Sequence, residues 1–305
     1  RNDSACIDST RRLLRRGLTT DVYESLLRHN QNVIKGNDVD YRSPFYGEAP
    51  REEIIDHWGR ILYAVSMPPR IQELEESEAH KIGPYSIRRG WNYRRPSLLG
   101  YWNQLDFTGD ADAFSLASSH LRGLVPRQLR SSKLDTAYEA MPRGTNLGLP
   151  TLVRDVRKAP EYLQRAKNLE AVHYSSSLDE SIWPAVLFWR GQPQGLDVDP
   201  KQRDVWGMDH IDTIIGKSIS DPLIAALRVL PMFKTWVHQN EVDLVVTDML
   251  SLGLPILSID FSAFDQHLNH HMIHEVFSVL REWFPLDHAK LEWLEDDFLH
   301  VGIVT

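Results

Sequence analysis

Two aspartates towards the end of the sequence are the residues best placed to do chemistry. Asp260 ends an apolar run that begins at Leu254, and Asp265 follows five residues later, just before a helical pattern. A short apolar run of this kind indicates a buried strand, which places the two carboxylates on a strand-to-helix turn. Such a turn can hold divalent cations that clamp the attacking and leaving oxygens of a phosphoryl transfer. Mg²⁺ suits it, because Mg²⁺ takes few carboxylates and leaves positions for phosphate oxygens.

Three cations lie on a predicted β-hairpin earlier in the chain. Residues 183–189 and 201–207 predict two strands, joined by a turn rich in Gly and Pro. Arg190 follows the first strand, and Lys201 and Arg203 lie on the second. Three neighbouring cations can bind a triphosphate and neutralise charge as a leaving group departs. The same residues also fit an ordinary solvated strand edge, and their spacing alone does not decide between the two interpretations.

A run of histidines follows the aspartates and offers a second kind of site. His267, His270, His271 and His274 occupy one arc of a predicted helix. His270 and His274 have a helical spacing that can bind zinc, although the glutamate of the H-E-x-x-H pattern is missing. A metal-dependent hydrolase that uses the two aspartates with His270 and His274 is therefore an alternative, and a polar surface is the structural interpretation. The acidic triplet 295–297 is interpreted as a solvated helix face.

Size and composition set the class of protein. The 305 residues are 42% hydrophobic, 25% charged and 10% aromatic, as in a globular protein with a substantial core. No apolar run approaches the roughly 20 residues of a membrane span, and no signal peptide is recognised at the start. The single cysteine excludes an internal disulfide and a cysteine-cage zinc site.

The charge is unevenly distributed along the chain. The net charge is −8, yet residues 121–170 hold ten Lys or Arg against five acidic residues. Residues 241–305 hold two basic residues against twelve acidic ones. A basic middle and an acidic end suit a polyanion path leading to a metal site, and they also suit an uneven surface without a partner.

Periodicity predicts a mixed α and β protein. Further strands are predicted at 242–246 and 255–259, and the arginine- and aromatic-rich stretch 85–95 suits either an RNA-gripping surface or a surface strand. Helices are predicted at 1–35, 51–67, 111–124, 129–140, 151–172 and 221–238, and residues 73–80 are interpreted as a short acidic helix or a loop. No P-loop, Rossmann glycine motif or G-x-S-x-G elbow occurs in the sequence, so those three folds lose support.

Three segments, in a fixed order, resemble motifs of one family. Residues 259–266 (Ile-Asp-Phe-Ser-Ala-Phe-Asp-Gln) resemble palm motif A of viral RNA-dependent RNA polymerases, most closely those of picobirnaviruses and partitiviruses. Phe188-Trp-Arg-Gly-Gln with Lys201-Gln-Arg-Asp-Val-Trp-Gly resembles the split basic motif F of the same family. Residues 142–150 (Pro-Arg-Gly-Thr-Asn-Leu-Gly-Leu-Pro) resemble the template-side loop, motif G. The order G, F, A is the order found in the family.

The resemblance implies a fold and a division of the chain. The fold class would be α+β, a right-hand polymerase. Three regions would follow each other: a mainly helical N-terminal extension at 1–90, fingers at 91–240, and the start of the palm at 241–305. Motif B and the Gly-Asp-Asp of motif C are not found, so the sequence is expected to be the N-terminal half of a polymerase and to be inactive alone.

The resemblance also implies roles for single residues in RNA-directed nucleotidyl transfer by two Mg²⁺ or Mn²⁺ ions. Asp260 would bind the metals, together with the backbone carbonyl of Phe261. Asp265 would lie near the ribose of the incoming nucleotide and select it through the 2′-hydroxyl. The cations that would bind the triphosphate are Arg190, Lys201 and Arg203. The residues that would line the template path are Arg143, Thr145 and Asn146.

The partners implied by the resemblance are template RNA and nucleoside triphosphates, and a viral capsid protein is a further candidate. No membrane partner is expected, and the place of action would be the virion interior or the host cytoplasm. A non-catalytic RNA-binding domain with incidental aspartates remains a third alternative on the residues alone.

Overall fold

The structure is a computed structural model that describes residues 13, 16–36, 51–79, 88–102, 110–125, 128–142, 144–154, 160–177, 182–192, 201–253 and 255–304. The chain divides into two compact units. Unit 1 contains residues 1–100, 186–207 and 304–305, whereas unit 2 contains residues 101–185 and 208–303. These units are defined by packing, and they divide the chain differently from the three regions expected from the motif order.

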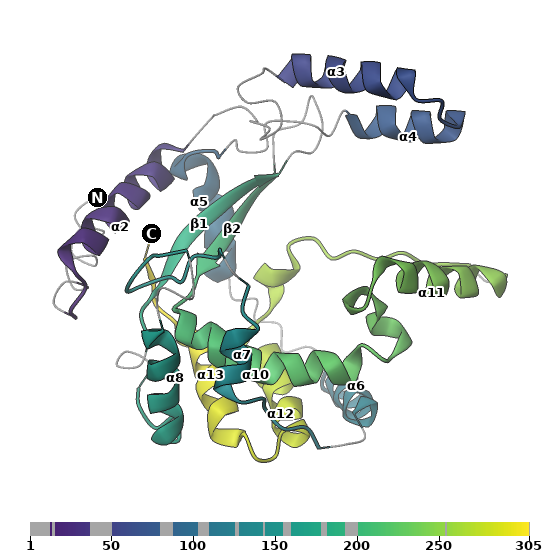
Figure 1. The fold of residues 1–305 in the computed structure, drawn as a ribbon. Coiled ribbons are helices and arrows are strands. Elements are labelled where there is room, and N and C mark those ends of the chain that lie inside the picture. The colour runs from purple at the N-terminus through teal and green to yellow at the C-terminus, as the bar shows by residue number, and fades with distance from the viewer. Residues whose placement is uncertain are drawn as a thin grey trace. The chain divides into compact units, whose positions relative to one another are not determined.

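Unit 1 combines a small sheet with helices from the first part of the chain (Figure 1). The sheet has three strands in the order β2-β1-β3, and β1 and β2 are antiparallel. Its helices are α2 (Thr20–Lys35), α3 (Arg51–Ala64), α4 (Pro69–Ala79) and α5 (Trp91–Leu99). Its strands are β1 (Ala185–Gln192), β2 (Lys201–Gly207) and β3 (Ile303–Val304). The hairpin predicted from the sequence is therefore confirmed, and the turn between its strands lies outside the described residues.

The hairpin follows the period of two that its sequence predicts. On β2 the side chains of Lys201, Arg203 and Val205 are exposed, while the alternate residues are half-buried. On β1, Leu187 and Trp189 are buried and pack with Val33 of α2 and Leu98 of α5. One face of the hairpin thus belongs to the core of unit 1, and the other face presents the cations.

Two glycines allow the end of α2 and the start of α5 to lie close together. Gly36 ends α2 with a positive φ of 77°, which an L side chain adopts only under strain. A Cβ atom at Gly36 would lie 2.5 Å from the backbone nitrogen of Gly90, the residue before α5. A side chain at position 36 would therefore force the two helices of unit 1 apart, which is the physical reason for glycine at this crossing.

Unit 2 is mainly helical, and α10 packs against three of its neighbours, α7, α8 and α13. Its α-helices are α6 (Ala111–Leu124), α7 (Leu134–Glu139), α8 (Glu161–Ala171), α10 (His210–Leu227), α11 (Gln239–Ser251), α12 (His270–Trp283) and α13 (His288–His300). Short 3₁₀ helices are η1 (Gly100–Trp102), η3 (Pro231–Trp236) and η4 (Phe264–His267). Figure 1 shows α10 beside α13, against which it packs.

The core of unit 2 follows from the spacing of isoleucines on α10. Ile211, Ile214, Ile215 and Ile219 recur at positions i, i+3, i+4 and i+8, so they share one face, and all four are buried. Burial of each such side chain stabilises the fold by about 1.5–3 kcal/mol. The carboxylate of Asp209 accepts hydrogen bonds from the backbone N–H groups of Ile211 and Trp183 and so fixes where α10 begins.

Several predicted elements differ from the structure, among them the helix predicted at 221–238, where α10 ends at Leu227 and the 3₁₀ helix η3 follows. Residues 242–246 are part of α11 and are not a strand, because the valines there continue into a helical repeat that ends at Ser251. The predicted helix 151–172 is shorter and begins at Glu161. Residues 255–259 form no strand among the residues that the structure describes, and they are exposed, so the buried strand predicted there is wrong.

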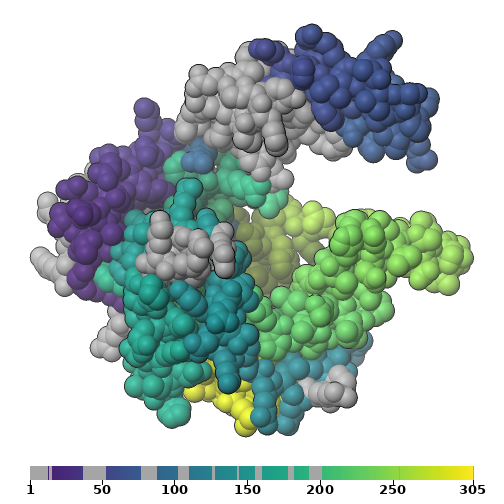
Figure 2. All heavy atoms as spheres, in the orientation of Figure 1, coloured from purple at the N-terminus to yellow at the C-terminus, as the bar shows by residue number. Residues whose placement is uncertain are grey.

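The segment between η3 and η4 exposes many apolar side chains. Helix α11 and η3 contain no buried residue, and in the space-filling view α11 projects from the rest of unit 2 (Figure 2). Leu250 is 61% exposed and Leu257 is 80% exposed. An exposed apolar stretch of this extent is typical of a surface that packs against another polypeptide segment. No helix in the described part of the chain is long and apolar enough to cross a membrane.

Candidate functional site

Asp260 directly follows residues 255–259, which have no regular secondary structure, and it lies shortly before a turn of the backbone. Its side chain is exposed, and within the described residues its carboxylate has no hydrogen bond or ion pair. The turn is set by Ala263, whose φ of 50° lies in the left-handed region. The amide of Gln266 donates to the carbonyl of Ala263 at 2.9 Å, and η4 follows. The turn therefore presents an open carboxylate next to the backbone carbonyl of Phe261, and both are hard oxygen donors of the kind Mg²⁺ prefers.

Asp265 lies on η4 in the same turn. Its side chain is exposed, and its Oδ2 atom accepts a hydrogen bond from the hydroxyl of Tyr101, 164 residues earlier in the sequence. Both residues belong to unit 2. Sequence reasoning did not find Tyr101, because no local pattern marks a tyrosine that meets an aspartate at this separation. The turn thus places two carboxylates five residues apart in the sequence. The carboxylate of Asp260 has no partner among the described residues, and that of Asp265 is hydrogen-bonded to Tyr101.

The three predicted cations lie on the solvent face of the hairpin in unit 1. Arg190 stands directly opposite Arg203 in the strand register, and Lys201 stands opposite Gln192. All three cationic side chains are exposed. Like charges placed opposite each other on one sheet face repel. An anion bound between Arg190 and Arg203 would reduce that repulsion.

The other face of the hairpin is held by a buried ion pair that the sequence did not reveal. Arg94 of α5 is 2% exposed, and its guanidinium donates to the carboxylate of Asp204 on β2. Asp204 is the cross-strand neighbour of Trp189, and the Arg94 guanidinium also lies 5.2 Å from the Trp189 ring centroid. The stretch 85–95 was expected to grip RNA or to form a strand, whereas residues from Trp91 onwards form a helix and Arg94 is internal. The only sequence feature that could have indicated the ion pair is the period of two in β2, which places Asp204 on the face opposite to Arg203.

A histidine of α2 also supports the hairpin. The Nε2 atom of His29 lies 2.8 Å from the carbonyl oxygen of Leu187, and its ring packs 4.7 Å from that of Phe188. Burial lowers the pKa of His29 below its ordinary value of 6.5, and the nearby Arg88 acts in the same direction. The imidazole is therefore neutral at pH 7, and it serves the packing of unit 1.

The loop with the template-side motif lies in unit 2 and is anchored by buried side chains. Leu147 and Leu149 are fully buried, and the Leu149–Pro150 bond is cis. Asn146 uses its side chain within the loop: its amide donates to the carbonyl of Leu152 at 3.0 Å, and its oxygen accepts from the N–H of Gly148 at 2.9 Å. Asn146 therefore shapes the loop, while Thr145 is exposed. Arg143 lies outside the described residues.

The histidines of the alternative metal site are not brought together with the aspartates. His274 is paired with Glu295 at 2.8 Å, and Glu295 is in turn paired with Arg281 at 2.5 Å. The ring of His270 lies 6.2 Å from that of His300. In the described part of the chain, no group of three or more His, Cys, Asp or Glu side chains is arranged to hold a metal ion. A hydrolase built on His270 and His274 therefore has no support from this geometry.

The acidic triplet at 295–297 was expected to be solvated, yet Glu295 and Asp297 are buried. Asp297 is 2% exposed and hydrogen-bonds to Asp212 of α10. Burial, the hydrogen bond and the charge of Asp212 raise the pKa of Asp297 to about 9. The prediction failed because α13 packs against α10 and α12, so this part of the helix faces the interior. The pair of carboxyls holds a proton at neutral pH.

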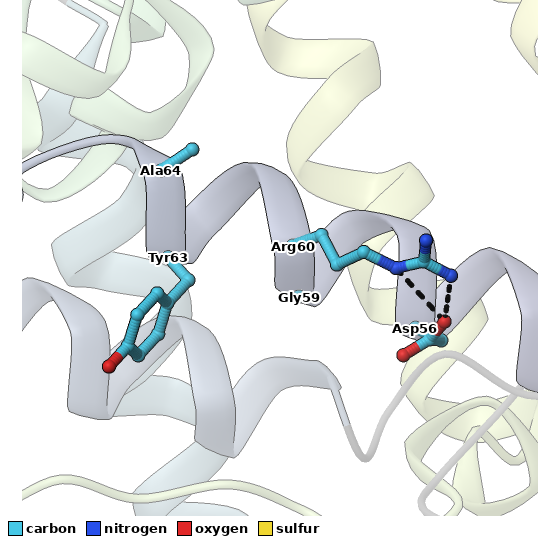
Figure 3. Close-up of a pocket in the computed structure, with 5 residues that line it drawn as sticks. All are labelled: Asp56, Gly59, Arg60, Tyr63 and Ala64. Atoms are coloured by element: carbon cyan, nitrogen blue, oxygen red, sulfur yellow. Dashed lines mark hydrogen bonds and ion pairs between the residues drawn. The ribbon is translucent and has the colours of Figure 1, made fainter.

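A surface hollow on α3 does not coincide with these residues. It is lined by Asp56, Gly59, Arg60, Tyr63 and Ala64, all from one helix, and Arg60 is paired there with Asp56 (Figure 3). Side chains of a single helix cannot enclose a ligand, and the cation in the hollow is already neutralised. The hollow is therefore not a candidate for the active site.

Comparisons with known proteins give a consistent result. No protein-family model matches the chain. The chain is 29% identical over 248 residues to a potential RNA-dependent RNA polymerase of a human picobirnavirus (strain Human/Thailand/Hy005102/-). That match covers 78% of this chain and 46% of the relative, so the chain spans about half the length of the curated relative it matches.

Solved structures show the same likeness. The crystal structure of an insertion-loop deletion mutant of a human picobirnavirus RNA-dependent RNA polymerase matches with a TM-score of 0.64 and 27% identity, over 89% of this chain and 55% of that one. The structure without the deletion matches with a TM-score of 0.60 and 26% identity, over 88% of this chain and 53% of that one. The resemblance seen in the three motifs is thus confirmed, and the chain has the α+β fold of about half of a picobirnavirus RNA-dependent RNA polymerase.

Proposed function

We propose that this chain is part of an RNA-directed RNA polymerase of a double-stranded RNA virus, a nucleotidyltransferase that extends a primer on an RNA template. The observation that carries the proposal is the structural match at a TM-score of 0.64 and 27% identity to a polymerase of this class. Three motifs in the family's order support it independently of the fold. The proposed regions are the N-terminal extension at 1–90, the fingers at 91–240 and the start of the palm at 241–305.

Asp260 is the proposed metal ligand, together with the backbone carbonyl of Phe261. The donor set fits Mg²⁺ or Mn²⁺, because the Asp260 carboxylate is exposed and has no competing partner in the described residues. When bound, the metal ions stabilise charge on the attacking 3′-oxygen and on the leaving pyrophosphate. The proposed role of Asp260 is to fix their position next to the turn that precedes η4.

The basic hairpin is the proposed binding surface for the triphosphate. Arg190 and Arg203 form a cross-strand pair on its solvent face, with Lys201 further along β2. Guanidinium groups bind phosphate oxygens through two parallel hydrogen bonds, which fixes orientation as well as charge. Asp265 is the proposed partner of the ribose 2′-hydroxyl. The carboxylate accepts the hydrogen bond that a ribose hydroxyl can donate and a deoxyribose cannot.

The loop at 142–150 is the proposed guide for the template strand. Thr145 is exposed and Asn146 fixes the loop backbone, so the loop can present a defined surface. Arg143 would add a phosphate contact. The proposed partners are template RNA and nucleoside triphosphates, with a viral capsid protein as a further one. The proposed place of action is the virion interior or the host cytoplasm.

Template-directed incorporation by the full-length gene product tests this proposal. The substrate is a short RNA primer–template with one templating uridine, and each nucleoside triphosphate is offered separately with Mg²⁺. The expected result is addition of adenosine alone, with release of pyrophosphate. Release of inorganic phosphate without primer extension would favour a hydrolase, and RNA binding without any turnover of nucleotide would favour a binding domain. Either result would overturn the proposal.

A further inference from the structure

The carboxylate of Asp265 is held by one long-range contact. Asp265 lies on the exposed turn η4, and among the described residues the Tyr101 hydroxyl is its only side-chain partner. The backbone of this turn is fixed locally, because Gln266 and His267 both bond to the carbonyl of Ala263, at 2.9 and 2.8 Å. Neither contact touches the Asp265 carboxylate. The orientation of that carboxylate therefore depends on Tyr101.

Tyr101 is suited to this task by its own position. It lies in η1, directly after α5, and it is half-buried, so its ring has fewer orientations than an exposed side chain would have. Its hydroxyl donates to the Oδ2 atom of Asp265. A carboxylate has about four acceptor sites, so the Oδ1 atom stays available for a second donor. The Oδ2 atom accepts the hydrogen bond that holds the side chain, and the Oδ1 atom can accept a hydrogen bond from a ligand.

We propose that Tyr101 is a positioning residue for Asp265, and that discrimination between ribonucleotides and deoxyribonucleotides depends on its hydroxyl. The inference rests on the proposed function, in which Asp265 accepts a hydrogen bond from the ribose 2′-hydroxyl. A carboxylate held in one orientation meets that hydroxyl without first losing rotational freedom, which strengthens binding of the ribonucleotide alone. A deoxyribonucleotide has no hydroxyl at this carbon and gains nothing from the orientation.

The test is the substitution Tyr101→Phe in the full-length gene product, which removes the hydroxyl and keeps the ring. Single-nucleotide incorporation is measured with ATP and with dATP on the same primer–template. We expect kcat/KM for ATP to fall by about tenfold, the loss of one charge-assisted hydrogen bond. The kcat/KM for dATP should stay unchanged, so selectivity falls by the same factor. General damage to the fold would lower both values, which separates positioning from a merely structural role.

Two further variants complete the design. Tyr63→Phe is the matched control, because Tyr63 lies on α3, is 87% exposed, and loses the same hydroxyl. It should leave both kcat/KM values unchanged. Asp265→Ala is the reference and should lower selectivity at least as far as Tyr101→Phe does.

The outcomes distinguish the inference from the function on which it rests. If Asp265→Ala lowers selectivity and Tyr101→Phe does not, the positioning role of Tyr101 is wrong while the role of Asp265 stands. If Tyr101→Phe raises kcat/KM for ATP, the hydroxyl competes with the ribose, and the inference is again wrong. If Asp265→Ala leaves selectivity intact, the proposed role of Asp265 fails, and the inference fails with it.

Discussion

Arg190 and Arg203 face each other across the hairpin, and this pair belongs to the surface proposed to bind the triphosphate. Both side chains are exposed on the same sheet face, directly opposite in the register. Like charges in this arrangement destabilise a strand pair. A cross-strand arginine pair becomes favourable once an anion lies between the two guanidinium groups, because each can then bind phosphate oxygens. We propose that the pair lowers the stability of the hairpin and raises its affinity for a polyanion.

The substitution Arg203→Gln tests this proposal. We expect the free energy of unfolding to rise by up to about 1 kcal/mol at low salt, because the repulsion is removed. Affinity for ATP should fall about tenfold or more, through the loss of charge-assisted hydrogen bonds. Urea unfolding and isothermal titration measure the two effects. Lys201→Gln is the control: Lys201 faces Gln192, so its removal should not stabilise the fold.

Asp297 makes the stability of the chain depend on pH. Its pKa is raised to about 9 in the folded protein, against an ordinary value of 3.8, through burial and the neighbouring Asp212. The folded state therefore keeps a proton that the unfolded state releases above about pH 4. The free energy of unfolding should fall as the pH rises from about 5 to 8, by about 1.4 kcal/mol per pH unit at most.

Asp297→Asn should remove most of this slope and make the variant more stable than its parent at pH 8, because the amide needs no proton. Urea unfolding at several pH values measures the effect. Glu292→Gln is the matched control, since Glu292 is exposed on the same helix and is not among the charges that raise the pKa of Asp297. A parent whose stability is flat between pH 5 and 8 would show that the carboxyl pair titrates normally.

At the scale of elements, α5 and the hairpin act as one piece. The buried pair of Arg94 and Asp204 joins the helix to β2, and Trp189 of β1 packs against the same guanidinium. The cations lie on one face of the hairpin, and this pair holds the other face. Loss of the pair would leave a charge buried without a partner, which is far more costly than loss of an exposed ion pair.

Asp204→Ala should lower the free energy of unfolding by about 3–5 kcal/mol, because it leaves Arg94 buried and unpaired. Asp56→Ala is the control: the Asp56–Arg60 pair is exposed, and its loss should cost about 1 kcal/mol or less. Both are read from urea unfolding curves. Equal costs for the two variants would show that the Arg94 pair is solvated in solution.

Elements with a clear local pattern could be predicted from the sequence, and those decided by packing could not. The hairpin strands alternate, and residues 111–124 have helical composition, so these two predictions are confirmed. The valines at 242–246 fit a strand or a helix equally well over five residues, and only the longer repeat of α11 decides. The burial of Asp297 could not be predicted either, because it is determined by the helices that pack around α13.

At the scale of the whole molecule, motif order carried the functional prediction further than any single residue could. The segments at 142–150, 188–207 and 259–266 were identified from the sequence alone, and the likeness to picobirnavirus polymerases confirms the family resemblance. The contacts that support these segments were not found in this way. Tyr101 meets Asp265 across 164 residues, and Arg94 meets Asp204 across 110 residues, so only the folded chain reveals them.

The rate of template-directed nucleotide incorporation by an Asp260→Ala variant of the full-length gene product tests the central claim most directly. Asp260 is exposed and has no partner in the described residues, so the variant should fold as its parent does. We predict a loss of about 10³-fold or more in rate, because the metal ions lose their ligand. Asp248→Ala, on exposed α11, should retain full activity. An Asp260→Ala variant that works within about tenfold of the parent rate would contradict the account.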